Sequence, residues 1–385
     1  MLPPKLIRRL VLAPAVPILT LLLITTLPLV AIVAAFASNW LPGRLRALRL
    51  LWFLLVFAVV ESLAAIALFV LWIASGFGRR LDDERWQAAH YRLMRLYLVA
   101  IVRAAERAFN LDFDVDADEA RAAAFDVDAT LPTPDRQPGA QTGHGHGPAH
   151  AGATDADRRA PLLVFSRHAG PGDSFLLVYA LLQLRFRPRI VLRDTLQWAP
   201  VLDTALNRVP SFFVSAGAPP GTGRRAIADL AAGMGPGDAL VLFPEGRNFT
   251  PQRRRHSITR LEELGDHRAA ERAREMRHVL TPRPGGALAA MEMAPDAEVV
   301  FVAHTGLEDL SSAVDLWRGV PMDSRIRVKL WRVPTPEVPK HPEEAAGWLL
   351  GWWRRIDRWI LRHYGQEAIP DAVIREVSED GQGPP

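Results

Sequence analysis

The chain has 385 residues, of which 49% are hydrophobic, and a formal net charge of +4 with a pI of about 9.8. It contains no cysteine, which excludes disulfides, a cysteine nucleophile, iron–sulfur clusters and thiolate zinc sites. The mild basic excess suits anionic partners. No zinc-finger spacing, RNA-binding aromatic motif or long basic block supports nucleic acid among them.

Two long apolar segments open the chain. Residues 10–38 carry no charge and exceed the roughly 20 residues that a membrane-spanning helix needs. A cleaved signal peptide is the alternative, but its apolar part is normally about 7–15 residues long. Residues 50–77 contain one acid, Glu61, which we expect either to face a protein partner or to lie in a less buried turn. Arginines flank both segments, so their distribution does not decide the orientation. We expect residues 1–80 to form a membrane helical hairpin.

The next region, residues 81–128, is predicted to link the hairpin to the rest of the chain. Apolar residues spaced three and four apart predict a helix over residues 82–110, and an edge strand is expected at 111–115. Residues 129–159 are rich in Pro, Gly, Ala and Asp without an apolar period, which predicts a disordered insertion. Its histidines, at positions 144, 146 and 150, are better explained by low complexity than by a metal site.

From residue 161 onward, apolar runs alternate with helical patterns. This alternation predicts an α/β fold, a mostly parallel sheet flanked by helices with right-handed crossovers. Strands are expected at 162–165, 189–192, 211–214, 239–243, 299–302 and 326–330, and helices at 174–184, 223–232, 257–278 and 286–293.

The C-terminal part, residues 336–385, is predicted to be an amphipathic helix over 343–362 followed by a tail. Tryptophan, leucine and isoleucine share one face of this helix, and arginines occupy the other. Such a helix suits the headgroup zone of a membrane. It equally suits a helix packed on the domain with its arginines in solvent, because periodicity alone does not separate the two.

Two short motifs carry the chemistry. Residues 166–173 read Ser-Arg-His-Ala-Gly-Pro-Gly-Asp, and residues 242–247 read Leu-Phe-Pro-Glu-Gly-Arg. Each follows an apolar run, where a buried strand empties into a loop. His168 suits a general base because its ordinary pKa of about 6.5 leaves neutral imidazole abundant at pH 7. Asp173 is close enough in sequence to accept a hydrogen bond from the far ring nitrogen. The alternative is a histidine that only caps a helix beginning near Asp173.

Together the two motifs resemble those of the glycerolipid acyltransferase family, which includes 1-acylglycerol-3-phosphate acyltransferases. The resemblance spans about residues 161–305 and implies a glycerol-3-phosphate acyltransferase-like catalytic domain over 160–335. It implies His168 as the catalytic base and Asp173 as its catalytic partner, with Glu245 and Gly246 holding a glycerol phosphate acceptor. No covalent intermediate is needed, in agreement with the lack of cysteine and of a G-x-S-x-G elbow.

The substrate-binding arginines depart from the family pattern. The family usually has F-P-E-G-T-R-S, whereas here Arg247 stands one position early and Asn248 takes the usual place. Arg253, in the arginine run that follows, is a second candidate for phosphate, which arginine binds in bidentate fashion. Arg193 corresponds to the basic motif that the family has between the histidine motif and the glutamate motif. Arg167 stands where the family more often has a small or amide residue.

Two later features stay open at this point. Residues 282–286 resemble the glycine-bearing turn that precedes a helix in this family, although a plain helix start fits equally well. Such a turn leaves backbone N–H groups free for a thioester oxygen or a phosphate. His304, near the end of an expected strand, is predicted to be a core or rim histidine rather than a second base.

The resemblance implies a membrane-bound O-acyltransferase that moves an acyl group from acyl-CoA or acyl carrier protein to lysophosphatidate, giving phosphatidate. It implies no cofactor and no metal, a lysophospholipid acceptor, the membrane as a partner, and no nucleic acid. We expect the cell membrane, with the catalytic domain on the cytoplasmic side. Two alternatives remain: an acyltransferase for another lysolipid or a glycolipid, motivated by the displaced arginine, and a catalytically silent membrane-anchored lipid-binding protein.

Overall fold

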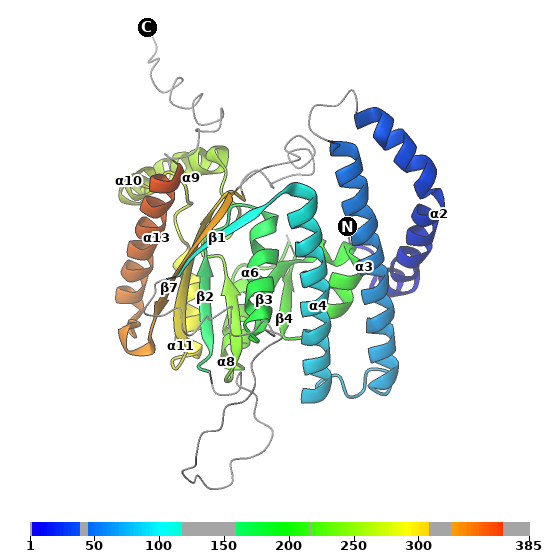
Figure 1. Cartoon of the computed structure of the whole chain (residues 1–385). Helices are drawn as coiled ribbons and strands as arrows, with labels where there is room; N and C mark the ends of the chain where they lie inside the picture. Colours follow the sequence, from blue (N-terminus) through cyan, green and yellow to red (C-terminus); the bar gives the residue numbers. More distant parts are fainter. Residues whose placement is uncertain (1, 39–44, 118–158, 216, 308–324, 365–385) are drawn as a thin grey trace, which may run out of the picture.

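The structure is a computed structural model that describes residues 2–38, 45–117, 159–215, 217–307 and 325–364. The insertion expected at 129–159, with its three histidines, lies outside the described residues except for Arg159, and so does the tail after residue 364. Figure 1 shows a central sheet with helices on both faces and a pair of long helices on one side.

The sheet has seven strands in the order β1-β7-β6-β2-β5-β3-β4. Neighbouring strands pair in parallel everywhere except between β6 and β7, which confirms the mostly parallel α/β fold. Residues of β2 and β5 are buried along their whole length, as expected for parallel strands covered on both faces. The strands are β1 (Asp112–Ala117), β2 (Leu162–Ser166), β3 (Arg187–Arg193), β4 (Ser211–Val214), β5 (Asp238–Leu242), β6 (Glu298–Thr305) and β7 (Arg325–Val333).

Helices cover the two faces of the sheet with separate apolar clusters. On one face, α8 (Thr222–Ala232), α11 (Pro284–Met293) and α13 (Pro342–Tyr364) share a core with β2, β5 and β6. On the other face, α6 (Pro171–Gln183) packs on the same strands. Beyond α6 lie α4 (Glu84–Phe109) and α7 (Pro200–Leu206). The short helices η5 (Asp194–Trp198) and η7 (Thr335–Glu337) complete this part of the chain.

The prediction of a single helix over residues 257–278 is wrong, because the helical segment is divided in two. The structure has two helices there, α9 (Pro251–Glu263) and α10 (His267–Glu275). Gly265 lies between them with φ of +75°, a conformation that glycine adopts without steric cost and that commonly ends helices. Asp266 then caps α10, because its side chain accepts a hydrogen bond from the Ala269 amide.

The C-terminal helix α13 packs on the domain. Leu349, Trp353, Ile356 and Ile360 are at most 1% exposed and belong to the same core as β6. Of the two arrangements that periodicity leaves open, the structure shows the helix packed on the sheet. Its tryptophan face therefore forms part of the protein interior.

Two apolar helices near the N-terminus, α2 (Ala13–Ser38) and α3 (Arg46–Ala74), are long and apolar enough to cross a membrane. The short α1 (Lys5–Ile7) and η1 (Arg8–Leu12) precede them. The helix α3 packs between α2 and α4 (Figure 1). Glu61 on α3 accepts a hydrogen bond of 2.7 Å from the Tyr97 hydroxyl on α4, so the lone acid of the second apolar segment faces another part of the protein.

Candidate active site

The two motifs meet because β2 and β5 are direct neighbours that run in parallel. Carboxyl ends of parallel strands lie on one edge of a sheet, where open α/β folds bind their ligands. His168 follows β2 by two residues and Glu245 follows β5 by three. We call this edge the carboxyl edge of the sheet.

His168 and Asp173 form a hydrogen-bonded pair. The distance from His168 Nδ1 to Asp173 Oδ2 is 3.0 Å. The imidazole also stacks on the Phe243 ring, with 4.3 Å between the centroids. A carboxylate on Nδ1 keeps the proton there and leaves Nε2 as the basic nitrogen. The His168 side chain is 18% exposed and that of Asp173 only 1%, so the imidazole is accessible from solvent and the carboxylate is not.

The carboxylate of Asp173 also caps the start of α6. Its Oδ2 accepts hydrogen bonds from the amides of Ala169 at 2.7 Å and Gly170 at 3.0 Å. Burial acts to raise the pKa of Asp173, but the hydrogen bond and charge of His168, the charge of His304 and the Gly170 amide together hold that pKa below its ordinary value. The aspartate therefore both caps the helix and holds the histidine.

Glu245 is buried beneath the His168 loop. Its Oε1 accepts a hydrogen bond of 3.0 Å from the His168 amide, and its Oε2 one of 2.8 Å from the Leu280 amide. The residue is 1% exposed. Burial raises its pKa to about 8, although the two amides and Arg167 act against the shift. Both carboxylate oxygens are thus bound to backbone amides, and Glu245 connects the His168 loop to a third segment of the chain.

Gly246 forms the turn after Glu245 with φ of +73°, in the left-handed region where glycine is the least strained residue. The Arg283 side chain lies against this turn, since a Cβ added at Gly246 would be 3.6 Å from Arg283 Cδ. Arg247 and Arg283 are both exposed. Within the described ranges, no hydrogen bond or ion pair holds either guanidinium.

Arg283 lies beside the Gly246 turn, although the two sequence motifs do not include it. The signal available in the sequence was its place in the segment 282–286, the glycine-bearing turn. Its proximity to Gly246 depends on a hydrogen bond of 2.8 Å from the Arg283 amide to the Pro244 carbonyl, which only the fold creates.

The other two predicted arginines lie at different places on the carboxyl edge. Arg253, on α9, donates from Nη1 to the Asn248 carbonyl at 3.1 Å, so it is attached to the turn of the second motif. Arg193 ends β3, which is separated from β2 by β5. Two strand spacings amount to about 10 Å. The structure therefore gathers the other predicted site residues around one turn and leaves Arg193 further along the edge.

Arg167, where the family more often has a smaller residue, crosses the interior beneath the site. It is 0% exposed. Its Nη1 donates to the His304 carbonyl at 2.7 Å and its Nε to the His278 carbonyl at 3.2 Å. Burying a charged side chain is costly unless it is hydrogen-bonded, and these two carbonyls offset part of that cost. Arg167 thus joins the end of β2 to two other segments.

His304 is buried next to the pair. Its Nε2 lies 3.3 Å from the Arg167 carbonyl and 3.7 Å from Asp173 Oδ2. With 3% of its surface exposed, it fits the expectation of a core histidine. Its contact with Asp173 has no signal in the sequence, because 131 positions separate them along the chain.

Comparison with known proteins adds one finding. Residues 148–305 match the family model described as Acyltransferase, a range that contains both motifs and ends with β6. No curated protein and no solved structure matches the chain. In the part of the chain that the structure describes, no group of three His, Asp or Glu side chains is arranged to hold a metal ion.

Proposed function

We propose that the acyl acceptor of this protein is lysophosphatidate and that its product is phosphatidate. The premise is that residues 148–305 match the Acyltransferase family model, the family of the glycerolipid acyltransferases. The donor is an acyl thioester, either acyl-CoA or acyl carrier protein. The observation that carries the proposal is the His168–Asp173 pair, 3.0 Å apart, with the imidazole open to solvent at the carboxyl edge.

The pair suits acyl transfer to a hydroxyl without a covalent intermediate. His168 Nε2 removes the proton from the acceptor hydroxyl as its oxygen attacks the thioester carbonyl carbon. The tetrahedral intermediate then collapses, the C–S bond breaks, and the imidazolium returns the proton to the leaving thiolate. Asp173 keeps the imidazole in the required tautomer and stabilises its charged form.

The acceptor phosphate is assigned to the arginines around the Gly246 turn. Arg247 and Arg283 flank Gly246 and lack partners among the described residues, so both are available to an anion. Arg253 is attached to the same turn through the Asn248 carbonyl, and Arg193 lies further out along the edge. Guanidinium groups bind phosphate oxygens in pairs, and a phosphate at Gly246 would bring the glycerol hydroxyl toward His168. Glu245 supports this arrangement from below by holding the His168 amide.

A test of the acceptor site separates two kinds of arginine. Arg247→Ala and Arg283→Ala are expected to raise the KM for lysophosphatidate by about 10-fold or more, with the KM for the thioester within about 2-fold. Asn248→Ala is the matched control in the same turn and should change neither constant. If the arginine variants instead raise only the thioester KM, these arginines bind the donor's phosphates, and the assignment to the acceptor is wrong.

Membrane attachment is proposed from the outer surfaces of α2 and α3. Large exposed apolar patches on a soluble protein mark contact with a membrane or a partner. Apolar side chains are exposed along both helices, among them Leu19, Leu22, Leu29, Ile32, Phe36, Leu63, Ile66, Phe69 and Ile73. The inner face of α3 is instead bound to the domain: Arg208 donates to the Leu68 carbonyl at 2.7 Å.

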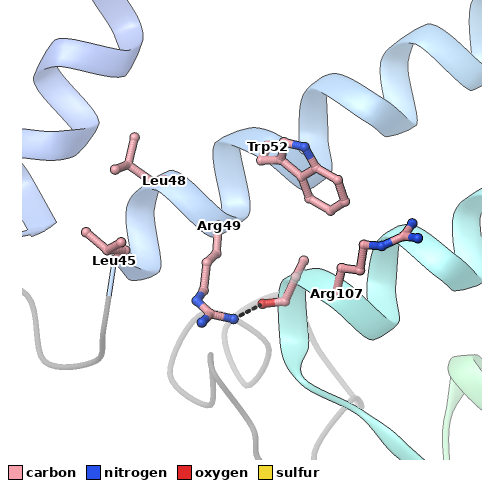
Figure 2. A pocket seen from close by; sticks show the side chains of 6 residues that line it. Leu45, Leu48, Arg49, Trp52 and Arg107 are labelled. Atoms are coloured by element: carbon pink, nitrogen blue, oxygen red, sulfur yellow. Dashed lines mark hydrogen bonds between the residues drawn. The ribbon is translucent and has the colours of Figure 1, made fainter.

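A hollow lined by arginines lies beside the apolar surface of α3, toward the carboxyl edge of the sheet. Figure 2 shows Arg49, Trp52 and Arg107 around it, between the start of α3 and the end of α4. Strand β1 begins just after α4, and its register with β7 places Asp112 beside Arg325, near the end of β6. The hollow therefore lies toward the carboxyl edge. Arginine and tryptophan are typical of the membrane–water interface, which supports a membrane surface beside this hollow.

We place the protein at the cell membrane, with the catalytic domain on the cytoplasmic side, where acyl thioesters are made. Flotation of the full-length protein with liposomes measures the attachment. Apolar anchoring predicts that the protein floats in both low and high salt, because screening weakens only ionic contacts. A protein that stays soluble without detergent and does not float would contradict the membrane assignment.

The activity is tested by thiol release from acyl-CoA, and by transfer from acyl carrier protein, with a panel of acceptors. Lysophosphatidate should be the preferred acceptor, with phosphatidate identified by mass. A second candidate, another lysolipid or glycolipid acceptor, is favoured by Asn248, which occupies the position where the family usually has arginine. Transfer only to other acceptors would support that candidate. No transfer from either donor would support the catalytically silent lipid-binding protein.

A further inference from the structure

The residues 276–280 between α10 and α11 form a hub beneath the active site. Met276 and Val279 are 1% exposed and Leu280 is 6% exposed. Side chains from four other parts of the chain bind the backbone of this segment, which we call the 276–280 segment. They are Arg254 on α9, Arg167 after β2, Glu245 after β5 and Asp357 on α13.

Two of these contacts lead from the segment to the base. The Leu280 amide donates to Glu245 Oε2 at 2.8 Å, and Glu245 Oε1 accepts from the His168 amide at 3.0 Å. The His278 carbonyl accepts from Arg167 Nε at 3.2 Å, and Arg167 directly precedes His168. A shift of the 276–280 segment is therefore transmitted to His168 by two routes.

On the opposite side, the segment is held by one carboxylate of α13. Oδ1 of Asp357 accepts hydrogen bonds from the amides of Arg277 at 2.9 Å and His278 at 2.6 Å. Asp357 is 5% exposed and stands among the buried residues of α13, next to Ile356. An ionisable side chain on an apolar face is costly unless its hydrogen bonds satisfy it. Packing alone would favour an apolar residue at this position, so the carboxylate needs another explanation.

We infer that Asp357 is a positioning residue of the active site. Through the 276–280 segment it holds Glu245 and Arg167 in place. These two residues in turn hold His168 within hydrogen-bonding distance of Asp173. The inference rests on the proposed function, because it takes His168 as the base. Helix α13 lies outside the residues that match the family model, so this chain completes its catalytic site with an element beyond that domain.

The expected kinetic effect of losing Asp357 follows from the role of His168 in the chemical step. Small displacements of a catalytic group raise the barrier of the chemical step steeply. Neither substrate is bound by Asp357, so its loss should lower kcat and leave both KM values nearly unchanged. Loss of stability alone would not lower kcat at temperatures where the protein stays folded.

The experiment compares three variants of the full-length protein in detergent, with kcat, both KM values and the unfolding temperature measured for each. Asp357→Ala should lower kcat by about 10- to 100-fold, with both KM values within about 3-fold. Asp357→Asn should keep kcat within about 3-fold, because both amides bind the same oxygen and an amide oxygen also accepts. Leu349→Ala, on the same buried face of α13, should lower the unfolding temperature but not kcat.

Each contrary result overturns the inference. An Asp357→Ala protein with normal kcat, or with a loss no larger than that of Leu349→Ala at equal stability, would make Asp357 only structural. If Asp357→Ala does not fold, Asp357→Glu replaces it: the carboxylate, moved by one methylene, should still reduce kcat, and full activity would overturn the inference. Wild-type protein without any transfer overturns the proposed function as well, whereas active wild type beside an unaffected Asp357→Ala overturns this inference alone.

Discussion

The Asp173 carboxylate shows how one residue serves structure and chemistry together. Its Oδ2 contacts the His168 ring nitrogen and accepts hydrogen bonds from the Ala169 and Gly170 amides, so one atom both caps the start of α6 and holds the His168 ring. This part of the site was predictable from the sequence, because its members lie within five positions and follow a recognisable strand. The contacts of Arg283, His304 and Asp357 were not, because each joins segments far apart in the chain.

Because the pKa of Glu245 is raised by burial, we expect the stability of the fold to depend on pH. Its pKa is raised from 4.5 to about 8, mainly by burial. Below pH 4.5 the carboxyl is protonated in both the folded and unfolded chain; between these two values only the folded chain keeps the proton. Stability from this group is therefore present at low pH and falls as pH rises through the window.

Glu245→Gln removes this titration. The glutamine adds a constant cost, because its amide nitrogen faces a backbone N–H, but that cost does not vary with pH. Unfolding temperatures measured from pH 5 to pH 8 should therefore shift in favour of the variant relative to wild type as the pH rises. Parallel profiles for the two proteins would show that Glu245 does not hold its proton in the folded state.

At the scale of elements, the sequence patterns located the sheet well and the helix environments less well. The apolar runs of β2 and β5 predict buried parallel strands because such strands need no alternation. The break between α9 and α10 was missed, although Gly265 was its signal. For α13, the spacing of its apolar residues did not reveal what they would face; the structure places them on β6, where Trp352 stacks on Phe301 with centroids 4.4 Å apart.

The hydrogen bond between α3 and α4 is expected to stabilise the protein. Tyr97→Phe removes the hydroxyl that donates to Glu61 and leaves a buried carboxyl oxygen without its partner. Losing one side of such a buried hydrogen bond costs about 1–3 kcal/mol. Thermal unfolding in detergent should show the loss for Tyr97→Phe. Tyr179→Phe, a partly buried tyrosine of α6, is the control, and equal behaviour of the two variants would argue against the hydrogen bond.

For the molecule as a whole, the apolar helices α2 and α3 are packed into the fold. On α4, Tyr91 and Met94 are 8% exposed and Leu98 is 5% exposed, and they share an apolar cluster with Ala64 and Leu68 of α3. At the N-terminal end, Arg8 donates to Asp203 of α7 at 2.9 Å. The apolar helices were evident from the sequence, but their attachment to the domain was not, because composition does not specify a partner.

Removal of residues 1–80 is therefore expected to destabilise the protein and not to release a well-folded soluble domain. The deletion uncovers the apolar face of α4, so the truncated protein should aggregate or unfold at a lower temperature than the full-length protein in the same detergent. Size-exclusion chromatography and thermal unfolding measure this. A monodisperse truncated protein of full stability would show that the contact between α3 and α4 contributes little.

We propose that His168 acts as the base of acyl transfer and Asp173 as its partner. Thiol release from acyl-CoA with lysophosphatidate is measured on wild-type protein and on the His168→Ala and Asp173→Asn variants, at matched unfolding temperature. His168→Ala should lower kcat by about 10²–10⁴-fold. Asp173→Asn should also be severely impaired, because the amide does not stabilise an imidazolium and favours the wrong tautomer. Near-wild-type transfer by His168→Ala would contradict the account, since the pair at the carboxyl edge would then have no part in the chemistry.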